Sequence, residues 1–206
     1  MITRHVETSI HGRFLHEDRG GDRLLVGFHG YAESADTHFA ELEKLPGIER
    51  WSVIAIQALH PFYVRSSGSV VASWMTALDR EMAIAENIAY VTNVLASLPT
   101  PKTLVYVGFS QGAAMASRAA AHVGRPNGLM LLGGDIPPEI KSSDLRLPPT
   151  LLGRGKSDEW YTEEKFKKDL NYLESTSRVV PVVFDGGHEW SDAYREAAGR
   201  FLIEVA

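Results

Sequence analysis

Short apolar runs alternate along this chain with longer segments in which apolar residues recur at helical spacing. Runs such as Thr103 to Val107 (TLVYV) and Val179 to Phe184 (VVPVVF) have the length and β-branched content of buried strands. The strands are predicted at 24–28, 52–57, 103–107, 129–132, 149–152 and 179–184, with one or two more within 3–16. Helices are predicted at 35–45, 79–98, 111–122, 162–174 and 190–205, and 59–71 is expected to be irregular.

Strict alternation of strands and helices predicts an α/β protein with a mostly parallel central sheet. Helices are expected on both faces of such a sheet, because its strands are apolar on both sides. Ligands of open parallel sheets bind where the strands end at their carboxyl edge. The loops that follow the strands are therefore the place to look for chemistry.

Composition limits the class of protein. The 206 residues fit one domain, 1–206, and their 44% hydrophobic and 23% charged content is ordinary for a globular chain. A net charge of −5 argues against a nucleic-acid partner. No cysteine is present, which excludes disulfides and a cysteine nucleophile. No apolar run approaches a membrane span, and the first residues lack the apolar core of a signal peptide, so a cytoplasmic protein is expected. A homodimer remains open.

One loop carries the pattern of a serine nucleophile. Gly108-Phe109-Ser110-Gln111-Gly112 matches G-x-S-x-G and joins a predicted strand to a predicted helix. The serine of this motif occupies a sharp, strained turn, and small residues two positions away on either side leave room for it. Ser110 is therefore the predicted nucleophile, although a plain strand-to-helix turn that needs two glycines is the alternative.

A serine nucleophile needs a base within hydrogen-bond reach. Only two histidines follow Ser110 in the chain. His122 falls at the far end of the helix that begins at the motif, where it suits the helix dipole. His188 follows the last predicted strand and lies at the carboxyl edge, so it is the predicted base.

Four aspartates compete for the role of the acid that orients the base. Asp185 is too close to His188 in sequence to reach round to the ring, and Asp144 lies in a polar loop. Asp158 follows the strand at 149–152 and is favoured, with Asp135, which follows the strand at 129–132, as the second choice. An alternative role for Asp158 is to cap the helix that follows it.

Acyl transfer also needs two N–H donors for the oxyanion. The backbone N–H of Gln111, directly after the nucleophile, is one expected donor. The N–H of Tyr31 is the other, because Phe28-His29-Gly30-Tyr31 follows the buried strand at 24–28. His29 is expected to be structural, since no second histidine at i+3 or i+4 accompanies it as a metal ligand would require.

These motifs together resemble the α/β-hydrolase superfamily and, within it, the phospholipase/carboxylesterase family of small esterases and acyl-protein thioesterases. The matching stretches are Phe28 to Tyr31, Gly108 to Ala113, Gly155 to Asp158, and Gly187-His188, with Trp74 as a further similarity. The resemblance implies an α/β-hydrolase fold and a Ser110–His188–Asp158 triad. It also implies a reaction that needs no metal and no organic cofactor. No lid domain is expected, because the stretch between strands from about His60 to Met75 is too short for a helical lid. The family's usual H-G-x-G-D loop is changed here, where Ala32 and Glu33 stand in place of Gly and Asp.

The substrate is expected to be a small ester or thioester. Phe62, Tyr63, Trp74 and Trp190 are the predicted substrate-binding residues, because they place aromatic rings close to the motifs, and Trp160 is expected to narrow the pocket. Trp74 could equally belong to the core. Two other functions remain open at this stage. One is a serine peptidase on the same scaffold, and the other is a binding protein without catalysis.

Overall fold

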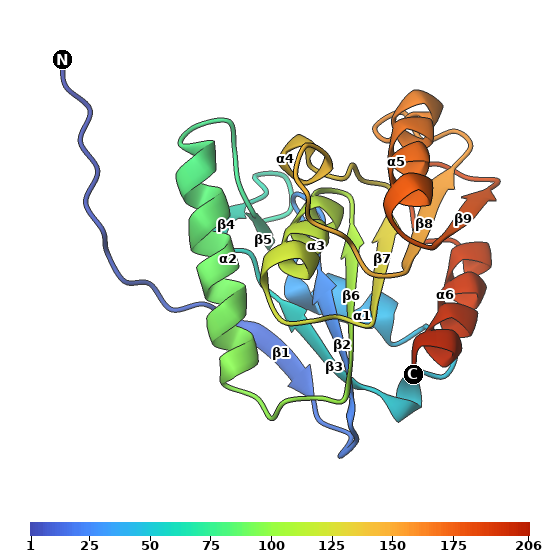
Figure 1. The fold of residues 1–206 in the computed structure, drawn as a ribbon. Helices are drawn as coiled ribbons and strands as arrows, with labels where there is room; N and C mark the ends of the chain where they lie inside the picture. The colour runs from blue at the N-terminus through green and yellow to red at the C-terminus, as the bar shows by residue number, and fades with distance from the viewer.

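The computed structural model describes all 206 residues and contains a seven-stranded sheet that is parallel except at one edge (Figure 1). The strands lie in the order β1-β3-β2-β6-β7-β8-β9, and only β1 runs antiparallel, against β3. Their bounds are β1 Phe14–Glu17, β2 Arg23–Phe28, β3 Ser52–Ile56, β6 Thr103–Phe109, β7 Gly128–Leu132, β8 Thr150–Gly155 and β9 Val179–Phe184. The predicted parallel sheet is thereby confirmed.

Helices cover both faces of the sheet, as the two-sided apolar strands predict (Figure 1). The helices are α1 Ala35–Leu42, α2 Arg80–Ala96, α3 Gln111–His122, α4 Pro138–Lys141, α5 Glu163–Thr176 and α6 Asp192–Val205, with a short 3-10 helix at Ile48–Arg50. None of these helices combines the length and the apolar content that crossing a bilayer would need.

Two hydrophobic cores lie on opposite faces of the sheet because successive strand residues point to opposite sides. In β6, Leu104 and Tyr106 pack with α2, α3 and α5, whereas Val105 and Val107 pack with α1 and α6. All four side chains are buried. This two-sided burial holds the central strands rigidly and fixes where their carboxyl ends meet.

Three segments differ from the sequence-based expectations. Residues 1–13 form no strand, and Figure 1 shows them leading away from the domain. The stretch expected to be irregular contains a hairpin, β4 His60–Tyr63 paired with β5 Val70–Ser73. The helix α4 was also not expected, because four residues are too few to show a helical period.

The hairpin lies between β3 and α2 in the chain. It is attached to the loop after β2 by two backbone hydrogen bonds, from Ala32 N–H to the Ala72 carbonyl (3.0 Å) and from Ala72 N–H to the Glu33 carbonyl (2.8 Å). No helical lid is inserted between β3 and α2. The absence of a lid domain agrees with the short chain.

Candidate active site

Ser110 occupies the turn between β6 and α3 with a strained backbone. Its φ of 54° and ψ of −121° are rare for a residue with a side chain. The turn is possible because its neighbours are glycines: a Cβ on Gly108 would lie 2.2 Å from the Gly112 carbonyl oxygen, and one on Gly112 would lie 1.9 Å from that of Phe28. The two glycines of the motif are therefore required by close backbone packing as well as by the turn.

His188 joins Ser110 to Asp158 through its two ring nitrogens. Nε2 lies 2.8 Å from Ser110 Oγ, and Nδ1 lies 2.8 Å from Asp158 Oδ2. Because an ionised carboxylate only accepts hydrogen bonds, the Nδ1 proton is donated to Asp158 and Nε2 is free to accept the serine proton. The structure thus brings together the three residues that sequence reasoning selected from three separate loops.

Asp158 is held by the loop that follows β8. Its side chain is 1% exposed, and Oδ1 accepts the backbone N–H groups of Trp160 (2.9 Å) and Tyr161 (2.8 Å). Asp158 does not cap the next helix, because Thr162 does so by accepting the Lys165 N–H. Every polar interaction of the Asp158 carboxylate therefore serves to aim Oδ2 at the imidazole.

Asp135, the second choice for the acid, does not contact His188. Its Oδ2 lies 3.3 Å from Lys165 Nζ, across the loop from the histidine. Gly133 directly follows β7 and packs against both His188 and Asp158, because a Cβ there would lie within 3.4 Å of each of them. The aspartate after β8 therefore takes the position beside the imidazole.

The loop after β2 passes close to Ser110, because a Cβ on Gly30 would lie 3.2 Å from the serine Cβ. The carbonyl oxygen of Gly30 lies 2.7 Å from His29 Nδ1 and 3.3 Å from the Glu33 nitrogen, and both groups donate to it. In a trans peptide the N–H points opposite to the carbonyl, so the Tyr31 N–H is turned the other way. It has no hydrogen-bond partner in the chain, and neither has the N–H of Gln111 at the start of α3. Both expected donors are free.

His29 is buried and neutral. Nδ1 donates to the Gly30 carbonyl, and Nε2 accepts the N–H of Ala58 at 3.0 Å. Burial lowers the pKa of His29 to about 4, because the charged ring would lose its hydration. The expectation that His29 is structural fits this arrangement.

The side chains of Glu33 and Gln111 make contacts that sequence reasoning did not predict. The Glu33 carboxylate accepts the Gly30 N–H at 2.7 Å, and burial raises its pKa. The side-chain amide of Gln111 accepts the Trp74 N–H at 2.9 Å and donates to the Met75 carbonyl at 2.9 Å. Glu33 was visible in the sequence only as a departure from the family's loop, and nothing in the local pattern indicated the reach of Gln111 to a distant loop.

The predicted aromatic substrate wall is only partly found beside the site. The rings of Phe62 and Tyr31 lie 5.7 Å apart in a tilted arrangement, so the hairpin contacts the loop after β2, and Tyr63 is exposed. Trp74 is 0% exposed, and its indole N–H donates to the His29 carbonyl, so the prediction that it binds substrate is wrong. Trp190 packs on Phe109 behind the His188 ring.

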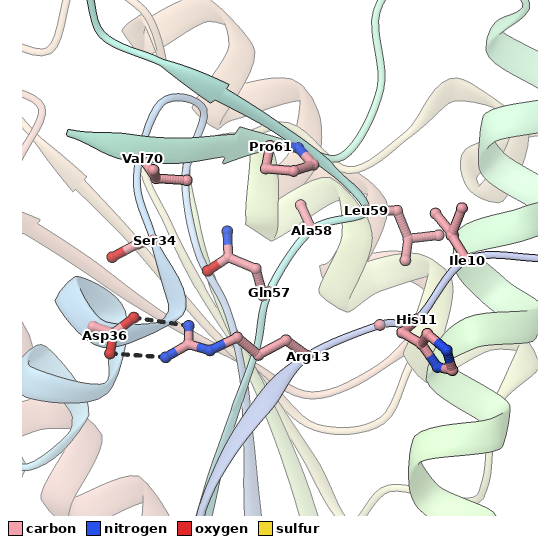
Figure 2. Close-up of a pocket in the computed structure, with 11 residues that line it drawn as sticks. Ile10, His11, Arg13, Ser34, Asp36, Gln57, Ala58, Leu59, Pro61 and Val70 are labelled. Carbon is pink, nitrogen blue, oxygen red and sulfur yellow. Dashed lines mark hydrogen bonds and ion pairs between the residues drawn. The ribbon is translucent and has the colours of Figure 1, made fainter. Parts of the chain in front are cut away.

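Two cavities have to be distinguished. One of about 220 Å³ opens at Ser110 and is lined by Gln111, Asp135, Trp160 and Lys165 among others. A larger one, of about 560 Å³, lies between the N-terminal segment and the hairpin, where Arg13 and Asp36 form an ion pair (Figure 2). The larger cavity is lined by none of the predicted catalytic residues and by neither of the two expected N–H donors. The chain has no group of three or more His, Cys, Asp or Glu side chains arranged to hold a metal ion.

Comparison with known proteins identifies the fold. No protein-family model matches the sequence, and no curated protein sequence matches it. Among solved structures, maize (Zea mays) acyl-protein thioesterase 2 is similar over 95% of this chain and 99% of its own, with a TM-score of 0.76 and 18% identity.

Two esterases give similar agreement. Esterase PE8 matches over 95% of this chain and 98% of its own, with a TM-score of 0.75 and 22% identity. The Bacillus cereus carboxylesterase covers 95% of both chains, with a TM-score of 0.74 and 15% identity. The chain therefore has the α/β-hydrolase fold of the small esterases and thioesterases.

Proposed function

We propose that this chain is a serine hydrolase that cleaves carboxylic esters or thioesters of small substrates. The observation that carries the proposal is the continuous hydrogen-bonded line from Ser110 Oγ through His188 to a buried, doubly anchored Asp158. Nucleophile, base and orienting acid are the arrangement that acyl transfer by serine requires. The similarity in fold to esterases and a thioesterase supports the same class of reaction.

In the proposed mechanism, Ser110 Oγ attacks the ester carbonyl while His188 Nε2 takes its proton. Asp158 stabilises the imidazolium that forms and keeps the ring in its orientation. The N–H groups of Tyr31 and Gln111 bind the oxyanion, and the N-terminus of α3 adds its positive dipole. His188 then protonates the leaving alcohol or thiol, and water, activated by the same ring, releases the acyl group from Ser110. No cofactor has a step in this sequence. Cytoplasmic location and a homodimer remain predictions.

Active-site labelling tests the proposal. The purified protein is expected to react with a fluorophosphonate probe and to hydrolyse p-nitrophenyl acetate. Ser110→Ala should abolish labelling and lower kcat by about a thousandfold or more. Ser66→Ala, in the exposed hairpin loop, is the control and should behave as wild type.

Three results would contradict this function. Labelling that survives Ser110→Ala would place the nucleophile elsewhere. A protein that neither labels nor turns over esters would be a binding protein with an inactive triad. Faster cleavage of peptide than of ester substrates would assign the chain to the peptidases instead.

A further inference from the structure

An ion pair forms part of the cavity that opens at Ser110. Asp135 Oδ2 lies 3.3 Å from Lys165 Nζ, and the two side chains are 46% and 48% exposed. Lys165 Nζ also donates to the Trp160 carbonyl at 2.9 Å, which leaves a third ammonium proton unused. Asp135 Oδ1 is covered by protein and has no hydrogen-bond partner, so Oδ2 is the carboxylate oxygen that can accept from a group in the cavity. The pair therefore offers Asp135 Oδ2 and the third ammonium proton of Lys165 beside Ser110.

The wall that carries this pair is rigid. The Tyr161 hydroxyl donates to Asp169 Oδ2 at 2.9 Å, and the same oxygen accepts the Ile136 N–H at 3.1 Å. Lys141 Nζ lies 2.7 Å from Asp169 Oδ1, and the Asp169 side chain is 1% exposed. This buried network ties the loop after β7, which holds Asp135, to α5, which holds Lys165. The backbone segments that carry the two residues are thus held in one relative position.

We propose that Asp135 and Lys165 form a specificity-determining subsite, and that the group of the substrate entering it is short and carries a hydroxyl. The inference rests on the proposed esterase function and names its substrate class. A hydroxyl is complementary to the pair, because it can donate to the carboxylate and accept from the ammonium. A charged group would be repelled by one member, and an apolar chain would remove water from both charges without replacing their hydrogen bonds.

The size of the cavity points the same way. Its volume of about 220 Å³ falls below the roughly 300–1,000 Å³ of pockets that enclose drug-sized ligands. Trp160, 75% exposed, stands at its edge. A long acyl chain would have to lie across a polar, confined surface, so short substrates are favoured.

Matched ester pairs test the subsite. In one arm, kcat/KM is compared for p-nitrophenyl 3-hydroxybutyrate and p-nitrophenyl butyrate. In the other, glyceryl monoacetate is compared with propyl acetate. The hydroxyl-bearing member of at least one pair should be preferred about tenfold, and the arm that shows the preference tells whether the acyl or the alcohol group occupies the subsite.

Substitutions then assign the preference to the pair. Asp135→Ala and Lys165→Met should each reduce the preference to less than threefold, mainly by raising KM for the hydroxyl-bearing ester. Lys168→Met is the matched control, because Lys168 lies on the same helix and pairs only with Glu164 at the surface. It should keep the full preference.

The outcomes separate this proposal from the one on which it rests. Fluorophosphonate labelling of Ser110 reports the nucleophile independently of the subsite. With labelling intact, equal rates within both ester pairs, or fastest turnover of p-nitrophenyl octanoate, would overturn the subsite. If either variant fails to fold, the kcat/KM values of the wild-type protein for the two ester pairs still decide whether the subsite exists. A preference that survives both substitutions would also overturn it.

Discussion

His29 Nδ1 lies 2.7 Å from the carbonyl oxygen of Gly30, the residue that follows it in the chain. That carbonyl belongs to the peptide whose N–H, at Tyr31, is the proposed oxyanion donor. A neutral ring with its proton on Nδ1 therefore holds one end of the peptide and so fixes the orientation of the N–H at the other end. Preorganised donors of this kind contribute strongly to acyl transfer because they need no rearrangement during the reaction.

Replacing His29 should weaken catalysis more than binding. His29→Ala frees the Gly30 carbonyl, so kcat for p-nitrophenyl acetate is expected to fall about tenfold or more with KM changed less than threefold. The Ala58 N–H also loses its buried acceptor, which costs about 1–3 kcal/mol of unfolding free energy. Denaturant titration and steady-state kinetics measure the two effects. A correctly folded His29→Ala variant with wild-type kcat would show that the orientation of the Gly30–Tyr31 peptide does not depend on His29.

Glu33 should act on the same loop from its other side. Its carboxylate accepts the Gly30 N–H at 2.7 Å, and the loop passes close to Ser110, because a Cβ on Gly30 would lie 3.2 Å from the serine Cβ. Glu33→Ala is expected to lower kcat about tenfold. Glu33→Gln keeps an acceptor oxygen and should restore most of it, with the pH profile of kcat unchanged. A shift in that profile would instead mean that the negative charge of Glu33 acts on His188.

Asp158 should be the acid on which His188 depends. Asp158→Asn keeps the side chain's size but loses the charge that fixes the Nδ1 proton, so kcat should fall by about a hundredfold to ten-thousandfold. Asp144→Asn, in an exposed loop, is the matched control and should leave kcat unchanged. If Asp158→Asn retained wild-type kcat, the hydrogen bond to His188 would have no part in the reaction.

Acid should destabilise the fold through two buried histidines. Burial lowers the pKa of His29 to about 4 and that of His38 to about 3, from an unfolded value near 6.5. Below pH 6.5 the unfolded chain binds protons at these histidines and the folded state does not. The free energy of unfolding is therefore highest above that pH and falls as the pH drops toward 4. From pH 7 to pH 5 each histidine should remove on the order of 2 kcal/mol.

Denaturant titrations at pH 7 and pH 5 measure this loss. His38→Phe should abolish the part of this loss of unfolding free energy that His38 causes. The His38 ring packs edge-on to Trp190 in the core between the sheet and α1. His122→Gln, at the exposed end of α3, is the control. An equal pH dependence in wild type and His38→Phe would contradict the assignment.

Much of the fold and of the candidate site could be predicted from the sequence. Strands such as Thr103–Phe109 are visible as apolar runs, and the residues of the Ser110 motif are constrained by local geometry that leaves few alternatives. His188 followed from its position after the last strand. The hairpin was missed because β4, with His60 and Pro61 exposed, has no apolar alternation.

The substrate wall shows where sequence reasoning ends. An aromatic residue near a motif can face the cavity or the core, and the pattern around Trp74 does not distinguish them. The packing of Trp74 against Phe28, at a ring distance of 5.6 Å, places it in the core. Lys165 was likewise an ordinary residue of a surface helix until the loop after β7 brought Asp135 against it.

The sequence by itself determined the alternating architecture, the strained serine turn and the order of the three proposed catalytic residues. These features depend on periodicity and on backbone conformations that only certain residues allow. The tertiary structure decided which aspartate meets His188, which donors fix the oxyanion loop and which side chains surround Ser110. Those contacts join residues dozens of positions apart, such as Asp158 and His188 or Ser110 and His188, and their geometry is set by how the loops pack at one edge of the sheet.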